Sequence, residues 1–374
     1  MHAGLADFRR LHAGMAPASR RVAVMDVLLL VAALVIILVG AEIFTNGVEW
    51  MGHRLDLAEG AVGSVLAAVG TAMPETMIPL VAIVLGARTG DTEEAGIGIG
   101  AILGAPFMLA TLAMLVTGIA VLVRARRPGR DDRLVVDPLV IGRDIRHFAV
   151  AYALAVGAAF LPASLAGGKV LVAAVLLGLY AFYVRAHLGE ERAGDAGEGL
   201  RPLRFRRLDP RRRERPPRLR LITFQVAAAV AAILVGAVVF VDAVGRLAGS
   251  VGVDPTIMAL VVAPVATELP EKFNSVIWIR QGKDTLSMGN ITGAMVFQSC
   301  IPTVVALLLA ADAWSVTSSS LLGFASAGMA FASTAAIFLP MLRRGRLTGR
   351  GLLVGGGFYA AYLGLVAGSL AGAI

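Results

Sequence analysis

The sequence reads Gly70-Thr71-Ala72-Met73-Pro74-Glu75 in its first half and, 196 positions later, Ala266-Thr267-Glu268-Leu269-Pro270-Glu271 in its second. Both stretches place a proline and a glutamate inside a long apolar run. A carboxylate in hydrocarbon is costly, and it normally marks an ion or proton site rather than a packing feature. Each proline also frees a carbonyl one turn earlier, at Gly70 and Ala266, because its ring removes a donor and clashes there. Acidic groups beside freed carbonyls, used twice, predict a cation site at the interface of two repeats.

The composition is that of a membrane protein. Of 374 residues, 57% are hydrophobic and 16% are charged, and the mean hydropathy is +0.78. The apolar residues form about ten stretches long enough to cross a bilayer as helices. Their approximate bounds are 26–48, 58–86, 95–123, 145–164, 168–187, 221–245, 254–280, 285–311, 316–341 and 351–374. The sequence therefore predicts an all-α polytopic membrane protein and excludes a soluble domain.

The charge distribution predicts the topology. The net charge is +8, and the arginines gather between the third and fourth, fifth and sixth, and ninth and tenth expected spans. With ten spans these loops share one side, which the positive-inside rule assigns to the cytoplasm. Arg9, Arg10, Arg20 and Arg21 favour the opposite orientation but are outnumbered. We expect an integral protein of a bacterial plasma membrane with both termini extracytoplasmic.

The chain divides at a polar, Arg- and Pro-rich segment. We expect an N-terminal tail at 1–25, a first membrane region at 26–187, a basic cytoplasmic loop at 188–219 without helical periodicity, and a second membrane region at 220–374. Each membrane region holds five expected helices. An odd number of spans per half inverts the second half relative to the first, which is a known transporter architecture.

An internal repeat supports this division. An offset of 196 places Leu38-Val39-Gly40-Ala41 on Leu234-Val235-Gly236-Ala237 and carries Thr71 and Glu75 onto Thr267 and Glu271. Further along, an offset of 189 places Gly100 on Gly289 and Gly104 on Gly293. The difference predicts a loop seven residues longer in the first half, around Thr89–Glu94. We expect two inverted five-helix repeats.

The candidate cation-binding residues offer oxygen ligands. Such ligands suit calcium, sodium or a proton rather than soft metals. In a regular helix Glu268 and Glu271 lie near one face. For Glu268 a plain ion pair or kink cap stays open, because its counterpart is Ala72, and for Gln298 an interhelical hydrogen bond stays open. The candidates are Thr71, Glu75, Thr267, Glu268, Glu271 and Gln298, with Gly70, Ala266 and Asn290 in support and Glu75 and Glu271 as calcium ligands.

Other classes of function find no support in the sequence. No Walker A motif and no nucleophile–base arrangement occurs, so we expect neither an enzyme nor an ATP-driven pump. The five histidines make no metal-ligand spacing, and Cys300 is the only cysteine. The expected partners are inorganic cations and membrane lipid, without a cofactor or nucleic acid. The sequence indicates no oligomeric state.

Three motifs resemble those of the calcium/cation antiporter superfamily and its sodium/calcium exchanger branch. Residues 70–75 and 266–271 resemble the family's Gly-Thr-Ser-x-Pro-Glu, and residues 288–294 resemble its Gly-Asn-x-x-Gly-Ser-Asn. The resemblance implies alternating access, with calcium held between Glu75 and Glu271 and by carbonyls near Thr71 and Thr267.

The chain departs from this pattern at the positions that help to form the sodium sites of the family. Four positions where the family has a serine are occupied here by other residues: Ala72, Glu268, Ala105 and Ala294. The family has an acidic or amide residue after the motif serines of the third and eighth spans, and this chain has Leu109 and Gln298 there. Three-sodium coupling is therefore in question, and the extra carboxylate of Glu268 suits a proton. We expect a secondary active antiporter that exchanges calcium for sodium or protons. The alternatives are a proton-coupled exchanger of another cation and a degenerate, non-transporting scaffold of the same fold; a channel fits less well.

Overall fold

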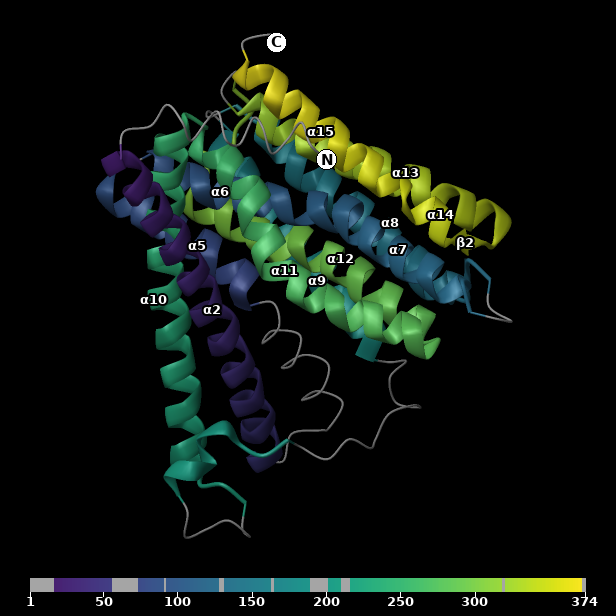
Figure 1. The fold of residues 1–374 in the computed structure, drawn as a ribbon, viewed down its shortest axis with the longest axis horizontal. Helices are drawn as coiled ribbons and strands as arrows, with labels where there is room; N and C mark the ends of the chain where they lie inside the picture. The colour runs from purple at the N-terminus through teal and green to yellow at the C-terminus, as the bar shows by residue number, and fades with distance from the viewer. Residues whose placement is uncertain are drawn as a thin grey trace.

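The computed structural model describes residues 17–55, 73–90, 92–127, 131–162, 165–188, 201–209, 216–317 and 320–371. Nearly all of them are helical, which confirms the expected all-α class (Figure 1). The helices are α2 (Pro17–Arg54), α5 (Met73–Thr89), α6 (Thr92–Met108), α7 (Met114–Ala125), α8 (Pro138–Gly157), α9 (Ala166–Leu188), α10 (Leu219–Val251), α11 (Pro255–Gln281), α12 (Asp284–Leu309), α13 (Leu321–Arg344), α14 (Gly349–Leu352) and α15 (Val354–Leu370). A π-helix, η2 (Leu109–Ala113), joins α6 to α7, and short 3-10 helices lie at η3 (Ala158–Phe160) and η6 (Arg204–Leu208).

Several of these helices are long and apolar enough to cross a membrane. Among the described residues seven segments meet that criterion: Val24–Arg54, Thr92–Ala125, Gly167–Ala186, Leu219–Val251, Asp284–Leu309, Leu321–Arg343 and Gly349–Ser369. Apolar helices of this length identify an integral membrane protein.

Local sequence signals set the helix ends. Asp137 and Asp254 cap α8 and α11 by accepting hydrogen bonds from the first backbone N–H groups, and a proline follows each aspartate. Gly252 and Gly282 end α10 and α11 with positive φ angles of 70° and 78°, which glycine adopts without a steric penalty.

The helices α2 and α10 form a closely packed antiparallel pair at one edge of the molecule (Figure 1). A Cβ added at Gly40 would lie 2.8 Å from Ile233 Cγ1, and one added at Gly236 would lie 2.7 Å from Ile37 Cγ1. Residues 37 and 40 correspond to 233 and 236 at the offset of 196, so the contact is reciprocal. The two glycines let the helices approach closely, as small residues do in lipid.

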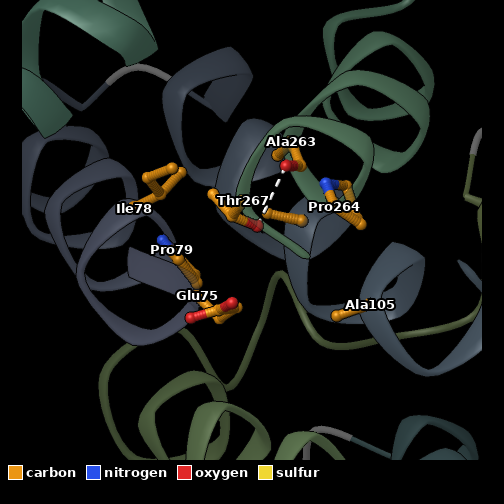
Figure 2. A pocket seen from close by; sticks show the side chains of 8 residues that line it. Glu75, Ile78, Pro79, Ala105, Ala263, Pro264 and Thr267 are labelled. Atoms are coloured by element: carbon orange, nitrogen blue, oxygen red, sulfur yellow. Dashed lines mark hydrogen bonds between the residues drawn. The ribbon is translucent and has the colours of Figure 1, made fainter. Parts of the chain in front are cut away.

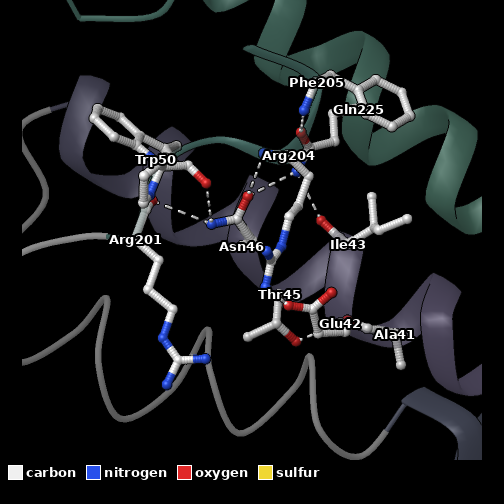
Figure 3. A network of polar contacts seen from close by, with 11 residues as sticks. Ala41, Glu42, Ile43, Thr45, Asn46, Trp50, Arg201, Arg204, Phe205 and Gln225 are labelled. Carbon is white, nitrogen blue, oxygen red and sulfur yellow. Dashed lines mark hydrogen bonds and ion pairs between the residues drawn. The ribbon is translucent and has the colours of Figure 1, made fainter. Parts of the chain in front are cut away.

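Residues 201–208 lie across the ends of α2 and α10 as a strap (Figure 3). Trp50 Nε1 donates to the carbonyl of Arg201 at 2.9 Å, and Asn46 Oδ1 accepts from the backbone N–H of Arg204 at 3.0 Å. Gln225 of α10 accepts from the N–H of Phe205 at 2.8 Å and donates to Ile43 O of α2 at 2.9 Å. A short 3-10 helix, η6, forms within the expected loop, where these side chains fix the backbone.

The helices α6 and α11 approach each other through two glycines. A Cβ at Gly100 would lie 2.0 Å from the carbonyl oxygen of Thr256, and one at Gly104 would lie 2.1 Å from that of Leu260. Only glycine permits such backbone proximity. The contact brings the two helices that flank the candidate site together.

The remaining helices pack in a crossed arrangement around this centre. The helices α8 and α9, from the first half, pack on α12 from the second, whereas α13 packs on α6 and α15 packs on η2. Strands β1 (Arg133–Leu134) and β2 (Leu347–Thr348) pair antiparallel, with Arg133 opposite Thr348. Two of the three arginine-rich connections therefore meet at the same end of the molecule.

The structure corrects three expectations about boundaries. The helix α2 begins at Pro17, inside the expected tail, and α8 begins at Pro138, whereas the expected span began at residue 145. The longer loop expected around Thr89–Glu94 is also wrong, because α5 ends at Thr89 and α6 begins at Thr92, just as α11 ends at Gln281 and α12 begins at Asp284. Instead, the helices themselves are longer in the first half. The helix α5 continues for 14 residues after Glu75, whereas α11 continues for ten after Glu271. The helix α6 begins eight residues before Gly100, whereas α12 begins five before Gly289. The extra residues lengthen both helices by about one turn.

Candidate functional site

One pocket is lined by residues from both copies of the repeated motif. Glu75 of α5 and Thr267 of α11 both line it (Figure 2). The other lining residues are Ile78, Pro79, Ala101, Ala105, Ala263 and Pro264, from α5, α6 and α11. The space has room for about one water molecule or dehydrated ion.

The polar groups of the pocket are deeply buried. Glu75 is 8% exposed and Thr267 is 2% exposed. The hydroxyl of Thr267 donates to the carbonyl of Ala263 at 3.1 Å, which leaves its lone pairs available as acceptors. The walls are otherwise apolar. A carboxylate in such surroundings favours either a bound cation or a proton, since both relieve the cost of a buried charge.

Glu268 follows Thr267 on α11 and is 1% exposed, so a second carboxylate is buried in the same helix. It does not line the pocket that Glu75 and Thr267 share. The helix α11 runs from Pro255 to Gln281 without interruption, through both Pro264 and Pro270. The prolines therefore remove backbone donors without breaking the helix.

The candidates on α12 lie outside this pocket. Gln298 is 3% exposed, and its Oε1 has no hydrogen-bond partner among the described residues. Asn290 donates to Ser275 Oγ of α11 at 3.3 Å, so it ties α12 to α11.

The remaining candidates cannot be placed in the same way. Gly70 and Thr71 lie outside the described residues. Ala266 and Glu271 lie on the α11 helix, but their side chains are outside the described part. Among the described residues no group of three or more His, Cys, Asp or Glu side chains is arranged to hold a metal ion.

Sequence reasoning missed other buried charged groups in the helices. Arg124 of α7 and Asp284 of α12 form a buried ion pair, and Asp144 of α8 is 1% exposed. The helical spacing of apolar residues could have predicted that Asp144 is buried, because Ile141, Phe148 and Ala151 lie on the same face of α8. A hydropathy window that begins at residue 145 excludes that aspartate, because the first turns of α8 are polar.

Comparisons with known proteins identify the family to which the chain belongs. The chain matches the profile described as "Sodium/calcium exchanger protein" over residues 25–188 and 221–370. An uncharacterized membrane protein of Methanocaldococcus jannaschii is 39% identical over 59 residues, which cover 16% of this chain and only 20% of that relative.

Solved structures share the fold. The structure of the H+/Ca2+ exchanger CAX is similar with a TM-score of 0.67 at 17% identity, covering 91% of this chain and 82% of that one. The structure of YfkE is similar with a TM-score of 0.57 at 15% identity, covering 96% and 98%. The sodium-calcium exchanger NCX_Mj is similar with a TM-score of 0.52 at 15% identity, covering 91% and 98%. The chain belongs to the sodium/calcium exchanger protein family, whose members are membrane transporters rather than enzymes.

Proposed function

We propose that this protein is a secondary active antiporter that exchanges calcium for protons or sodium by alternating access. One observation carries the proposal: Glu75 and Thr267, from the two copies of the repeated motif, line the same buried pocket. A carboxylate and a hydroxyl are hard oxygen ligands of the kind that calcium and sodium prefer.

The architecture proposed is one of ten membrane helices in two inverted repeats of five, with boundaries at 26–187 and 220–374. The reciprocal contact of Gly40 with Ile233 and of Gly236 with Ile37 supports it, because a twofold relation exchanges the members of each pair. The crossed packing of α8 and α9 on α12, and of α13 and α15 on α6 and η2, supports it as well.

The repeat extends the proposed site beyond the described side chains. Glu271 and Thr71 occupy the positions equivalent to Glu75 and Thr267, so we assign all four to the calcium site, together with carbonyls near Gly70 and Ala266. Two facing glutamates would repel each other when the site is empty. A divalent ion or a proton relieves that repulsion, which is the physical basis for exchanging one for the other.

Protons are the favoured counter-ion. The pocket is lined by Ala101 and Ala105 on the α6 side, so that helix offers no side-chain oxygen to a sodium ion. Glu268, in contrast, adds a buried carboxylate to α11. Compared with the family pattern, the chain lacks the serine hydroxyls at Ala72, Ala105 and Ala294 and has a carboxylate at Glu268, and this balance favours proton coupling.

The proposed orientation follows the charge distribution. The pairing of β1 with β2 places two arginine-rich connections at one end, and we assign that end to the cytoplasm. Both termini are then extracytoplasmic, in what we take to be a bacterial plasma membrane.

The test is calcium flux in proteoliposomes, with proton and sodium gradients imposed separately. Glu75→Gln and Glu271→Gln should abolish the flux, because each removes a proposed ligand charge. Glu93→Gln is the matched control, since Glu93 is an exposed glutamate on α6 away from the pocket. If neither gradient drives calcium or another divalent cation through the wild-type protein, the antiporter proposal fails and the non-transporting scaffold stands. Glu268→Ser should shift the dependence from the proton gradient toward the sodium gradient.

A further inference from the structure

A buried carboxylate lies on a different set of helices from the Glu75 pocket. Asp144 belongs to α8 and is in contact with α9 and α12. Tyr183 of α9 donates its hydroxyl hydrogen to Asp144 Oδ1 at 3.0 Å. Thr292 of α12 donates to Asp144 Oδ2 at 2.6 Å. Each carboxylate oxygen therefore meets a hydroxyl from a different neighbouring helix.

The hydroxyl of Thr292 has two acceptors within reach. It lies 2.6 Å from Asp144 Oδ2 and 3.1 Å from the carbonyl oxygen of Met288, one turn earlier on α12. A threonine hydroxyl has one hydrogen to donate and lone pairs to accept. It can donate to the aspartate, or it can donate to Met288 and accept a hydrogen from the aspartate.

This geometry satisfies Asp144 in both protonation states. When Asp144 is ionised, its two oxygens accept from Tyr183 and Thr292. When a proton from water binds to Oδ2, the new O–H donates to Thr292 Oγ1, and the threonine hydrogen turns to Met288 O. Release of the proton to water reverses these steps. No heavy atom needs to move, so neither state leaves a buried polar group without a partner.

Charged and titratable side chains among the described residues surround this site. On α8 they are Arg143, whose charge acts on Tyr183, and His147, whose ring lies 5.3 Å from that of Tyr183. On α9 the titratable neighbour of Tyr183 is Tyr180, and on α12 the sequence from 285 to 299 contains no titratable residue. From α13 the apolar Leu342 approaches this part of α8 at Gly142, and the neighbouring Arg343 is exposed.

The same contact reaches α12. A Cβ at Gly293 would lie 3.3 Å from Tyr183 Oη, so α12 is packed closely against the hydroxyl that holds Asp144. Thr292 and Gly293 lie on the helix that also carries Asn290 and Gln298. A change in the hydrogen bonds of Thr292 therefore acts directly on α12.

We infer that Asp144, Tyr183 and Thr292 form a proton-binding site separate from the Glu75 pocket, and that its protonation is coupled to cation exchange through α12. The inference deepens the proposed function and rests on it for the coupling, whereas proton binding itself can be tested without transport. Its ligand is a proton rather than a metal ion, because the Thr292 hydroxyl can turn to Met288 O and accept a hydrogen from Asp144, whereas the hydrogens of the two hydroxyls leave no set of free oxygens around the carboxylate for a metal ion.

Infrared difference spectroscopy between high and low pH tests proton binding on the purified protein. The wild type should show a band from a buried protonated carboxyl group that Asp144→Asn loses and that Glu93→Gln keeps. Asparagine preserves the size and the acceptor oxygen at this position, so the variant should fold, and its melting temperature checks this. Thr292→Ser should keep the wild-type spectrum, while Thr292→Val should alter the Asp144 band. If Asp144→Asn folds and its difference spectrum equals that of the wild type, the site is wrong.

Calcium flux at a series of pH values tests the coupling. Asp144→Asn should flatten the pH dependence of flux in proteoliposomes, and Thr292→Ser should restore the wild-type profile that Thr292→Val loses. A folded Asp144→Asn protein with the wild-type pH profile would overturn the coupling. A wild-type protein without flux would instead overturn the proposed function, and the infrared result would still decide whether Asp144 binds a proton.

Discussion

Replacing Gly100 with alanine should separate the two helices that flank the pocket. The new Cβ would lie 2.0 Å from the carbonyl oxygen of Thr256, whereas real Cβ atoms essentially never come closer than 3.0 Å. The helices α6 and α11 would have to move apart by about 1 Å to reach even that limit, and farther to restore an ordinary contact. Such overpacking costs about 1–3 kcal/mol, and a backbone partner places this site toward the upper end.

The matched control is Gly289→Ala, the equivalent substitution in the second half. A Cβ at Gly289 meets no atom within 4 Å. Both variants gain up to about 1 kcal/mol from the better helix propensity of alanine, so their difference isolates the overpacking. We expect Gly100→Ala to be about 1–3 kcal/mol less stable than Gly289→Ala.

Thermal unfolding in detergent measures this difference. Gly100→Ala should melt several degrees below Gly289→Ala and should also transport calcium more slowly, because Ala101 and Ala105 beside it line the pocket. Equal melting temperatures for the two variants would refute the close approach of α6 and α11 that forms one side of the pocket.

Further predictions concern the contacts that hold the scaffold. Replacing either Arg124 or Asp284 alone by alanine should destabilise the protein by about 3–5 kcal/mol, because a buried charge loses its partner, and the double variant should cost less than the two single changes together in a denaturation double-mutant cycle. Gln225→Leu should lower the free energy of unfolding by about 1–3 kcal/mol and loosen the strap, because the Phe205 N–H loses its acceptor. Trypsin should then cleave at the strap arginines faster than in the wild type, and an unchanged rate would contradict the structure. Asp254→Ala should lower stability by about 1 kcal/mol in thermal unfolding through loss of the α11 cap, with no loss of calcium binding by titration calorimetry.

The helices themselves are largely predictable from hydropathy. The expected stretch 221–245 lies inside α10, and 254–280 and 285–311 differ from α11 and α12 by only one or two residues at each end. Helices in lipid must satisfy their own backbone, so a long apolar run leaves few alternatives. The predicted bounds were displaced at α8, which begins at Pro138 rather than at residue 145, because neighbouring helices bury polar residues of its first turns and hydropathy does not register such packing.

The candidate site was predictable in part. The repeated motif identified Glu75 and Thr267, and the structure places both in one pocket. Sequence spacing did not predict the hydrogen bond from Asn290 to Ser275, because the rotation of α12 depends on its packing against α8 and α9. The same packing buries Asp144, and no local pattern predicts which tertiary partners an aspartate will meet.

The reciprocal contact between α2 and α10 has a consequence for how the chain can change. Each half presents one patch, an isoleucine and a glycine one turn apart, that fits an identical patch turned by half a revolution. A chain of half the length would therefore be self-complementary, and it would bury the patch by pairing with a second copy in the opposite membrane orientation. In the present chain the two copies are covalently joined and free to diverge elsewhere. At this seam, however, a larger residue at position 40 demands a smaller one at 233, and likewise for 236 and 37, so these positions should vary only in compensating pairs.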